Sequence, residues 1–271
     1  MSDIVMVFLI VARYTGHLSY TTRKSCKMEL ALTLLSFLFP SRCILCGQTV
    51  SAHADKKNIE LCGDCYGALP FNMNYCLRCA LPLVDGVSKN TLCGRCVRRL
   101  PDHDYAYSLF RYEGDIIRLI HQLKFSEKII CARSIGELLL SVLMEDGALS
   151  TERPDCLLPV PLHPSRLRQR GFNQSIEIAR VISKKLSIPI EYDAVIRCRR
   201  TTAQTGLNAS RRQKNIKDAF SVTSELSHRH ILIIDDVVTT GSTVNELARV
   251  LKNKKVERVG ILSIARAPVK G

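Results

Sequence analysis

The second half of the chain alternates between short apolar runs and longer stretches in which apolar residues recur with helical spacing. Short apolar runs that end in polar residues are typical of strands buried in a parallel sheet, and the longer stretches are typical of helices that cover it. The pattern therefore predicts an α/β domain, a parallel sheet flanked by helices. The expected strands are 105–112, 155–160, 192–196, 219–222, 231–234 and 258–264. The expected helices are 115–123, 131–143, a segment ending near 186, and 244–252.

One of these strands carries the most distinctive chemistry of the chain. Its apolar residues, 231–234, lead into Asp235 and Asp236, and a turn of small residues then leads into a helix. Free backbone N–H groups and the positive end of the helix dipole favour an anion in such a turn, and hydroxyl side chains add donors. A glycine lets the backbone close around a phosphate without a Cβ in the way. The turn consists of Thr239, Thr240, Gly241, Ser242 and Thr243.

Asp235 and Asp236 lie too close to this turn to favour the phosphate itself, but they suit sugar hydroxyls or a hydrated Mg²⁺. The alternative is an ordinary buried strand followed by a capped helix. Packing alone gives no reason for two adjacent acids followed by five small residues. The segment also lacks the Gly-Lys-Ser/Thr of a Walker A loop and the glycine spacing of a dinucleotide fold. We therefore expect a sugar-phosphate site with Asp235 and Asp236 as its catalytic acids.

Eight of the twelve cysteines form four Cys-x-x-Cys pairs between residues 43 and 96. Two intervening residues let both sulfurs of a pair bind one ion, and two pairs complete a tetrahedral site. The spacing predicts two structural Zn²⁺ ions, because four filled positions leave none open for catalysis. Gly47, Gly63 and Gly94 lie beside these cysteines, where we expect turns with positive φ. The expected ligands are Cys43, Cys46, Cys62, Cys65, Cys76, Cys79, Cys93 and Cys96.

The order in which the pairs combine stays open at this point. Sequential pairing, the first with the second and the third with the fourth, gives a double zinc ribbon and closes two loops of similar length. We favour it over an interleaved cross-brace. An iron–sulfur cluster is a further alternative for the same thiolates. The isolated cysteines are expected to be ordinary buried or surface thiols.

Composition and charge narrow the range of partners. A length of 271 residues suffices for a full α/β domain and a smaller unit. The net charge of +14 favours a polyanionic partner or a phosphate-rich ligand. Trp is absent and aromatic residues make up 6% of the chain, so a platform for base stacking is not expected.

A proline-rich loop follows the strand at 155–160, and arginines come directly after it. Ligands of α/β folds bind at the C-terminal ends of the strands. The arginines at 166, 168 and 170 form either a solvated face or, as we favour, a clamp for pyrophosphate or backbone phosphate. The ligand-binding residues expected here are Leu162, His163, Arg166 and Arg170.

Residues 197–217 carry seven basic residues and no acid. Such a segment suits either a loop that closes over bound pyrophosphate or a contact for a nucleic-acid backbone. A second basic cluster, at Arg95, Arg98 and Arg99, adds to a path for phosphates. The expected DNA-binding residues are Arg200, Arg211, Arg212 and Lys214.

Residues 1–40 are the least informative part. The apolar run at 5–12 is far shorter than the roughly 20 residues that span a bilayer, and no basic region precedes it as in a signal peptide. We expect a short helix at 29–38 and no stable membrane insertion. Met28 is a candidate start, and a weak membrane-surface anchor is the functional alternative for this segment.

Several stretches together resemble the ComF competence-protein family, from about residue 35 to the C-terminus. They are the cysteine pairs, Lys124-Phe125, residues 159–174 and 204–220, and the motif at 235–243. The order of that motif resembles the ribose-phosphate motif of type I phosphoribosyltransferases. The first 27 residues have no counterpart in the family.

The resemblance implies a double zinc ribbon at 41–100 and a type I phosphoribosyltransferase-like domain at 101–271, after an N-terminal extension with a short helix at 1–40. It implies a cytoplasmic protein of natural transformation that handles incoming single-stranded DNA, alongside a competence helicase and other uptake proteins. The ligand of the turn would be phosphoribosyl pyrophosphate with Mg²⁺, or a DNA 5′-phosphate. The alternative is an active phosphoribosyltransferase with an unknown acceptor, for which the sequence offers no identifiable acid or base.

Overall fold

The computed structural model describes residues 41–50, 60–84, 86–87, 91–125, 129–145, 153–199 and 216–268. The N-terminal extension, with its expected short helix and candidate start, lies outside these ranges. The four expected DNA-binding residues, Arg200, Arg211, Arg212 and Lys214, lie outside them as well.

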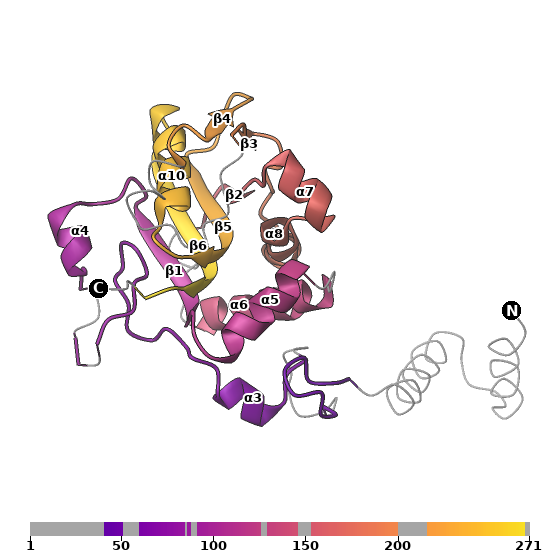
Figure 1. The fold of residues 1–271 in the computed structure, drawn as a ribbon. Coiled ribbons are helices and arrows are strands. Elements are labelled where there is room, and N and C mark those ends of the chain that lie inside the picture. Colours follow the sequence, from indigo (N-terminus) through magenta and orange to yellow (C-terminus); the bar gives the residue numbers. More distant parts are fainter. Residues whose placement is uncertain are drawn as a thin grey trace, which may run out of the picture.

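The centre of the molecule is a four-stranded sheet in the order β1-β6-β5-β2, in which every neighbouring pair is parallel (Figure 1). Its two inner strands, β5 and β6, are also its longest. The residues of β2 and the apolar part of β5 are buried, as continuous apolar runs in a covered parallel sheet require. The strands are β1 (Tyr105–Arg111), β2 (Cys156–Pro159), β5 (His230–Val238) and β6 (Arg258–Arg266).

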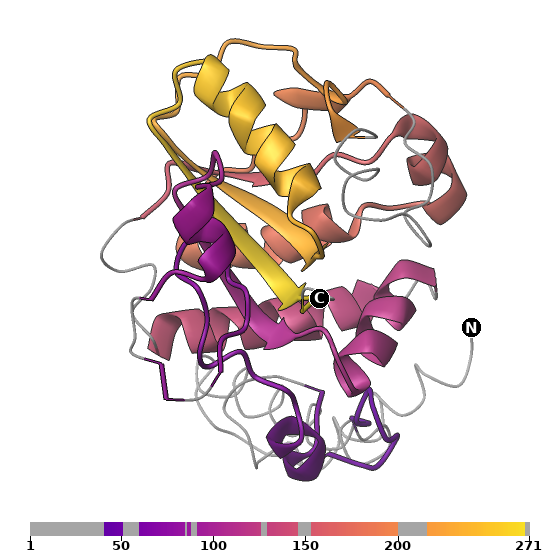
Figure 2. The same cartoon turned by 60° about the vertical axis from the view of Figure 1, so that its left-hand side comes forward.

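Helices cover both faces of this sheet, and alternate residues of each strand face opposite layers. Leu232 and Ile234 join the core on the side of α5, α6 and α8, whereas Ile231 and Ile233 pack on the side of α10. Figures 1 and 2 show α10 on one side of the sheet and α6 and α8 on the other. The helices are α5 (Asp115–Phe125), α6 (Ile129–Glu145), α8 (Gln174–Leu186) and α10 (Ser242–Asn253).

The two strands expected near 192–196 and 219–222 are present, and they pair with each other. β3 (Val195–Arg197) and β4 (Phe220–Val222) form a separate antiparallel pair beside the main sheet. This pair brackets residues 198–219, so both ends of the basic segment are anchored at one place.

The cysteine-rich residues form two small units that lie against the α/β core (Figure 1). The described residues of the first unit include the short helix α3 (Gly63–Gly67), and those of the second include α4 (Gly94–Arg98). The expectation of positive φ holds for Gly47, at 76°, but is wrong for Gly63 and Gly94, because these two glycines begin the short helices.

The fold class is therefore the predicted one, a parallel sheet flanked by helices with two cysteine-rich ribbons before it. Within the described ranges, no helix has both the length and the apolar character needed to cross a bilayer.

Candidate functional site

The turn between β5 and α10 has the local geometry of an anion site. Gly241 precedes the helix with a φ of 81°, a left-handed conformation that favours glycine. Ser242 N–H donates to Thr240 Oγ1 at 3.3 Å, and Ser242 Oγ lies 2.8 Å from the same Thr240 oxygen. The first turn of α10 contains no acidic residue, so no carboxylate of the helix itself neutralises the positive end of its dipole.

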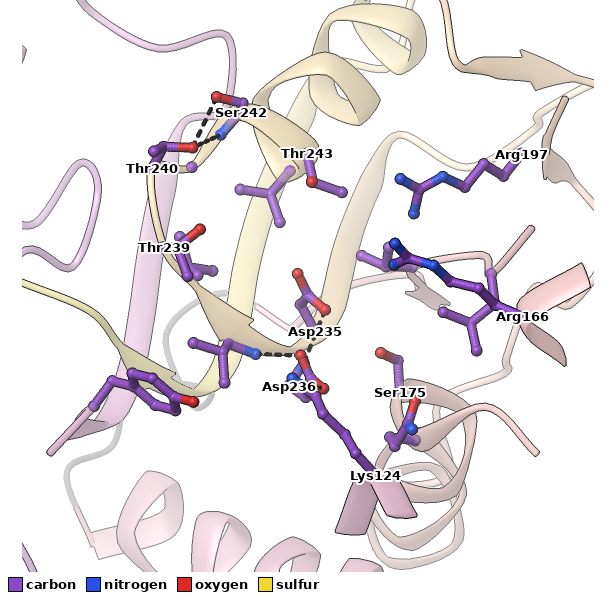
Figure 3. Close-up of a pocket in the computed structure, with 18 of the residues that line it drawn as sticks. Lys124, Arg166, Ser175, Arg197, Asp235, Asp236, Thr239, Thr240, Ser242 and Thr243 are labelled. Carbon is purple, nitrogen blue, oxygen red and sulfur yellow. Dashed lines mark hydrogen bonds and ion pairs between the residues drawn. The ribbon is translucent and has the colours of Figure 1, made fainter. Parts of the chain in front are cut away.

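This turn forms one wall of a cavity of about 710 Å³ at the C-terminal ends of β2 and β5 (Figure 3). That volume lies within the usual range for small-molecule sites. The cavity brings together every predicted sugar-phosphate residue except His163. Those that line it are Leu162, Arg166, Arg170, Asp235, Asp236, Thr239, Thr240, Gly241, Ser242 and Thr243.

His163 has a structural position instead. It is the N-cap of α7 (Pro164–Arg170), and Ser165 N–H donates to its Nδ1 at 3.2 Å. The helix also explains why only two of the three alternating arginines meet the cavity. Residues four apart share a helix face, so Arg166 and Arg170 line the cavity together, whereas Arg168 is exposed elsewhere. The arginines expected to form a phosphate clamp therefore lie on a helix, and two of the three line the cavity.

Two cations of the cavity were not among the predicted site residues. Lys124, near the end of α5, places its Nζ 2.9 Å from Asp236 Oδ2, and both side chains are largely buried, at 22% and 14% exposure. Arg197, the last residue of β3, is 6% exposed and lies with its guanidinium 5.6 Å from the centre of the Phe220 ring. The family resemblance at Lys124-Phe125 marked the lysine, but the basic composition of 197–217 did not separate Arg197 from its neighbours.

The two acids have unequal environments. Asp236 N–H donates to Asp235 Oδ1 at 2.9 Å, and Val237 N–H donates to Asp236 Oδ1 at 2.6 Å. Burial, and then the neighbouring charge of Asp236, raise the pKa of Asp235 to about 7. Burial also lowers the pKa of Arg170 and of Arg197. A cation bound beside Asp235 would stabilise its ionised form, and an anion bound beside Arg170 and Arg197 would stabilise their charged forms.

The side chains are arranged around a common space. Figure 3 shows Arg166 and Arg197 on one side, the hydroxyl-bearing turn on the other, and Asp235 with Asp236 between them. Among the described residues, four cations and two acids line the cavity, and together they give it a net positive charge even with both acids ionised. Such a site suits a ligand with several phosphate groups and a polyhydroxylated centre.

The eight cysteines of the four Cys-x-x-Cys pairs form two tetrads, and the pairs combine sequentially. Cys43, Cys46, Cys62 and Cys65 make the first tetrad, and Cys76, Cys79, Cys93 and Cys96 the second, with all sulfurs of a tetrad within 4.8 Å of one another. Cys46 and Cys62 sulfurs lie 3.7 Å apart, and those of Cys79 and Cys93 lie 3.6 Å apart. Tetrahedral zinc with bonds of about 2.3 Å needs sulfur separations of about 3.8 Å. None of these cysteines forms a disulfide, so the tetrads fit structural zinc.

A second cavity, of about 1090 Å³, shares the turn with the first. It lies between the second ribbon and the core, with Thr240, Gly241 and Ser242 in the wall common to both cavities. Its other walls are strongly basic. The cationic residues that line it are Arg95, Arg98, Arg99, Lys217, Arg249 and Arg266.

Comparison with known proteins agrees with both parts of this architecture. Residues 34–100 match the model of the double zinc ribbon domain, and residues 173–271 match that of the phosphoribosyl transferase domain. The chain is 33% identical over 228 residues to the DNA utilization protein YhgH of Shigella flexneri, and equally to that of Escherichia coli (strain K12). Each alignment covers 84% of this chain and 97% of the relative.

Competence protein F of Haemophilus influenzae is 32% identical over 233 residues, which cover 84% of this chain and 98% of that protein. The two family models together cover both cysteine tetrads and residues 235–243. With relatives above 30% identity aligned almost from end to end, the chain belongs to the ComF competence-protein family.

Proposed function

We propose that the protein binds phosphoribosyl pyrophosphate with Mg²⁺ in the 710 Å³ cavity, and that it handles single-stranded DNA in natural transformation. The observation that carries the proposal is the meeting, in one cavity, of a hydroxyl-rich turn at a helix N-terminus, an acid pair and four cations. The competence and DNA-utilization names of the relatives support the second half of the proposal.

The chemistry of each wall assigns the parts of the ligand. The N–H groups and hydroxyls of residues 239–243 suit the 5-phosphate. Asp235 and Asp236 suit the ribose hydroxyls or hydrated Mg²⁺, which would also stabilise the ionised form of Asp235. Arg166 and Arg170 face the turn from α7 and suit the pyrophosphate. Lys124 already forms an ion pair with Asp236, so this carboxylate does accept a cation.

A thermal-shift assay tests the ligand. Phosphoribosyl pyrophosphate with Mg²⁺ at a hundred times its Kd should stabilise the protein by about 2.7 kcal/mol. Asp235→Ala combined with Asp236→Ala should abolish the shift in a folded protein. Asp155→Asn, at the opposite end of the sheet where it accepts from Arg229 and His230 N–H groups, serves as the matched control and should keep the shift. A shift that survives in the double variant would overturn the assignment.

The second cavity supports a path for a DNA backbone. Arg95, Arg98 and Arg99 are exposed on and beside α4, and no ion pair found among the described residues involves them. Together with Lys217 they lead to the turn that both cavities share. Because aromatic residues are few, we propose contacts to phosphates that depend little on base sequence. Arg200, Arg211, Arg212 and Lys214 are proposed to extend the same path.

Salt dependence tests this path. The logarithm of the affinity for single-stranded DNA should fall with the logarithm of salt concentration by about 0.7 per phosphate contacted. Arg98→Ala with Arg99→Ala should therefore reduce the slope by about 1.4. Lys184→Ala with Lys185→Ala removes the same charge from the exposed last turn of α8 and should leave the slope unchanged. Equal slopes for the two double variants would contradict the proposed path.

Transfer chemistry is the second candidate function, and the intact acid pair within a clamp of cations favours it. In that case the cavity would stabilise departing pyrophosphate through Arg166 and Arg170. Release of pyrophosphate, measured with and without single-stranded DNA, distinguishes transfer from binding. A rate equal to that of the Asp235→Ala, Asp236→Ala variant would exclude transfer.

A further inference from the structure

The last residue of β6, Arg266, connects the second cysteine tetrad to the sugar-phosphate turn. Its side chain is 2% exposed. Its Nε donates to the carbonyl oxygen of Cys79 at 2.9 Å, and its Nη1 donates to the carbonyl oxygens of Val238 at 2.9 Å and of Thr239. The same Nη1 also donates to the carbonyl of Ala267 at 2.9 Å. One guanidinium thus forms hydrogen bonds both to a residue of the second tetrad, Cys79, and to the residues that begin the turn, Val238 and Thr239.

The backbone partners of Arg266 are carbonyl groups, which satisfy its donors but do not neutralise its charge, and the Cys79 side chain is a further hydrogen-bonding partner. Among the described residues, no carboxylate forms an ion pair with it. A buried charge is costly unless an opposite charge lies near it. Zinc bound by four thiolates carries a net charge of about −2, and the second tetrad lies beside the guanidinium.

The other end of the contact lies in the binding site. Thr239 and Val238 line the first cavity, and they are the residues through which β5 enters the turn. Their carbonyl positions determine where the following N–H groups point. Arg266 lies opposite Val238 in the β5–β6 register, so the sheet brings the guanidinium to the entry of the turn, and the ribbon adds the contact to Cys79.

We propose that Arg266 is a positioning residue that couples the second zinc site to the sugar-phosphate turn. The zinc–tetrathiolate centre supplies the countercharge for the buried guanidinium, and the guanidinium fixes the carbonyls at the entry to the turn. Because such coupling is reciprocal, a phosphate ligand on the turn also strengthens zinc retention at the second tetrad, and not at the first. The part of the proposal that concerns ligand affinity rests on the proposed function, and the part that concerns zinc does not.

Three variants separate charge from hydrogen bonding. Arg266→Met removes both, and Arg266→Lys keeps the charge without the fork of donors. Arg258→Met is the matched control, since Arg258 begins the same strand and packs 5.2 Å from the centre of the Tyr105 ring, away from both sites. The readouts are zinc release to a chromogenic chelator, hydrogen exchange of residues 239–243 without ligand, and calorimetric titration with ribose 5-phosphate.

Arg266→Met should release one of its two zinc ions at least tenfold faster than wild type and exchange faster at 239–243. Arg266→Lys should retain zinc, yet exchange faster at 239–243 and bind ribose 5-phosphate about tenfold more weakly. Arg258→Met should match wild type in all three. Zinc release from Arg266→Met no faster than from Arg258→Met would overturn the coupling.

Substitutions of zinc-ligand cysteines in the two tetrads keep the test decisive if Arg266→Met does not fold. Cys96→Ser, in the second tetrad, should raise exchange at 239–243, whereas Cys65→Ser, in the first, should not. Equal exchange in both would overturn the coupling. Absence of ribose 5-phosphate binding to wild type would instead overturn the proposed function, while zinc release and hydrogen exchange still decide the coupling.

Discussion

The substitution Asp235→Asn tests the electrostatics of the site in isolation, because it removes one carboxylate charge and keeps its shape. The amide oxygen of asparagine can still accept the hydrogen bond that Asp236 N–H donates to Asp235 Oδ1. Burial and the charge of Asp236 raise the pKa of Asp235 from 3.8 to about 7 in the folded protein. The ionised form of Asp235 is thus disfavoured by folding.

The raised pKa of Asp235 determines how its contribution to stability changes with pH. Since the folded-state pKa is the higher one, the stability linked to Asp235 is fully present below pH 3.8 and is lost as the pH rises through 7. Since a tenfold change in acidity is worth about 1.4 kcal/mol, raising the pKa of Asp235 from 3.8 to about 7 destabilises the folded protein at neutral pH by at most about 4 kcal/mol. Solvent in the open cavity screens the pair, so we expect roughly half of this, about 2 kcal/mol, or about 4–8 °C in Tm.

Melting curves of both proteins between pH 5 and pH 8 give the measurement. The advantage of Asp235→Asn should grow from pH 5 to about pH 7.5 and then level off. The same variant should bind phosphoribosyl pyrophosphate more weakly, the trade-off expected of a strained binding site. Asp155→Asn is the contrasting control, because hydrogen bonds from the His230 and Arg229 N–H groups lower the pKa of Asp155, and its loss should cost stability at neutral pH. A gain for Asp235→Asn that does not change with pH would refute the reasoning.

Three further predictions follow from individual contacts. Lys124→Met removes the cation 2.9 Å from Asp236 and should weaken phosphoribosyl pyrophosphate binding about tenfold in calorimetric titration, and an unchanged Kd would exclude Lys124 from the site. Gly260→Ala places a Cβ 2.2 Å from Tyr105 Cζ across the β1–β6 pair, so it should cost about 1–3 kcal/mol in urea unfolding, and a neutral result would contradict this packing. Cys43→Ser should reduce the zinc content from two ions to one per chain by elemental analysis while the α/β core stays folded by circular dichroism, whereas iron in the wild-type protein would contradict the zinc assignment.

The sheet and most of the site could be predicted from the sequence because they depend on local patterns. Apolar runs that end in polar residues placed β2 and β5, and the spacing of the cysteines placed both tetrads. The candidate anion-binding turn consists of five consecutive residues, 239–243, so the local sequence was enough to predict it.

The contacts that could not be predicted join residues far apart in the chain. Lys124 meets Asp236 across more than a hundred residues, and Arg266 joins Cys79 to Thr239 through the docking of a ribbon on the sheet. His163 does not line the cavity for a local reason, because Pro164 begins a helix and the histidine caps it. No pattern of residue types distinguishes a buried guanidinium from an exposed one, so the role of Arg197 also required the fold.

The most direct test of the sugar-phosphate site is hydrogen exchange of the wild-type protein with and without phosphoribosyl pyrophosphate and Mg²⁺. The account predicts that the ligand protects residues 239–243 and the N-terminal turn of α10, with weaker protection of α7 and none in the first ribbon. Protection confined to the ribbons, or protection of residues 239–243 that persists in the Asp235→Ala, Asp236→Ala variant, would contradict it.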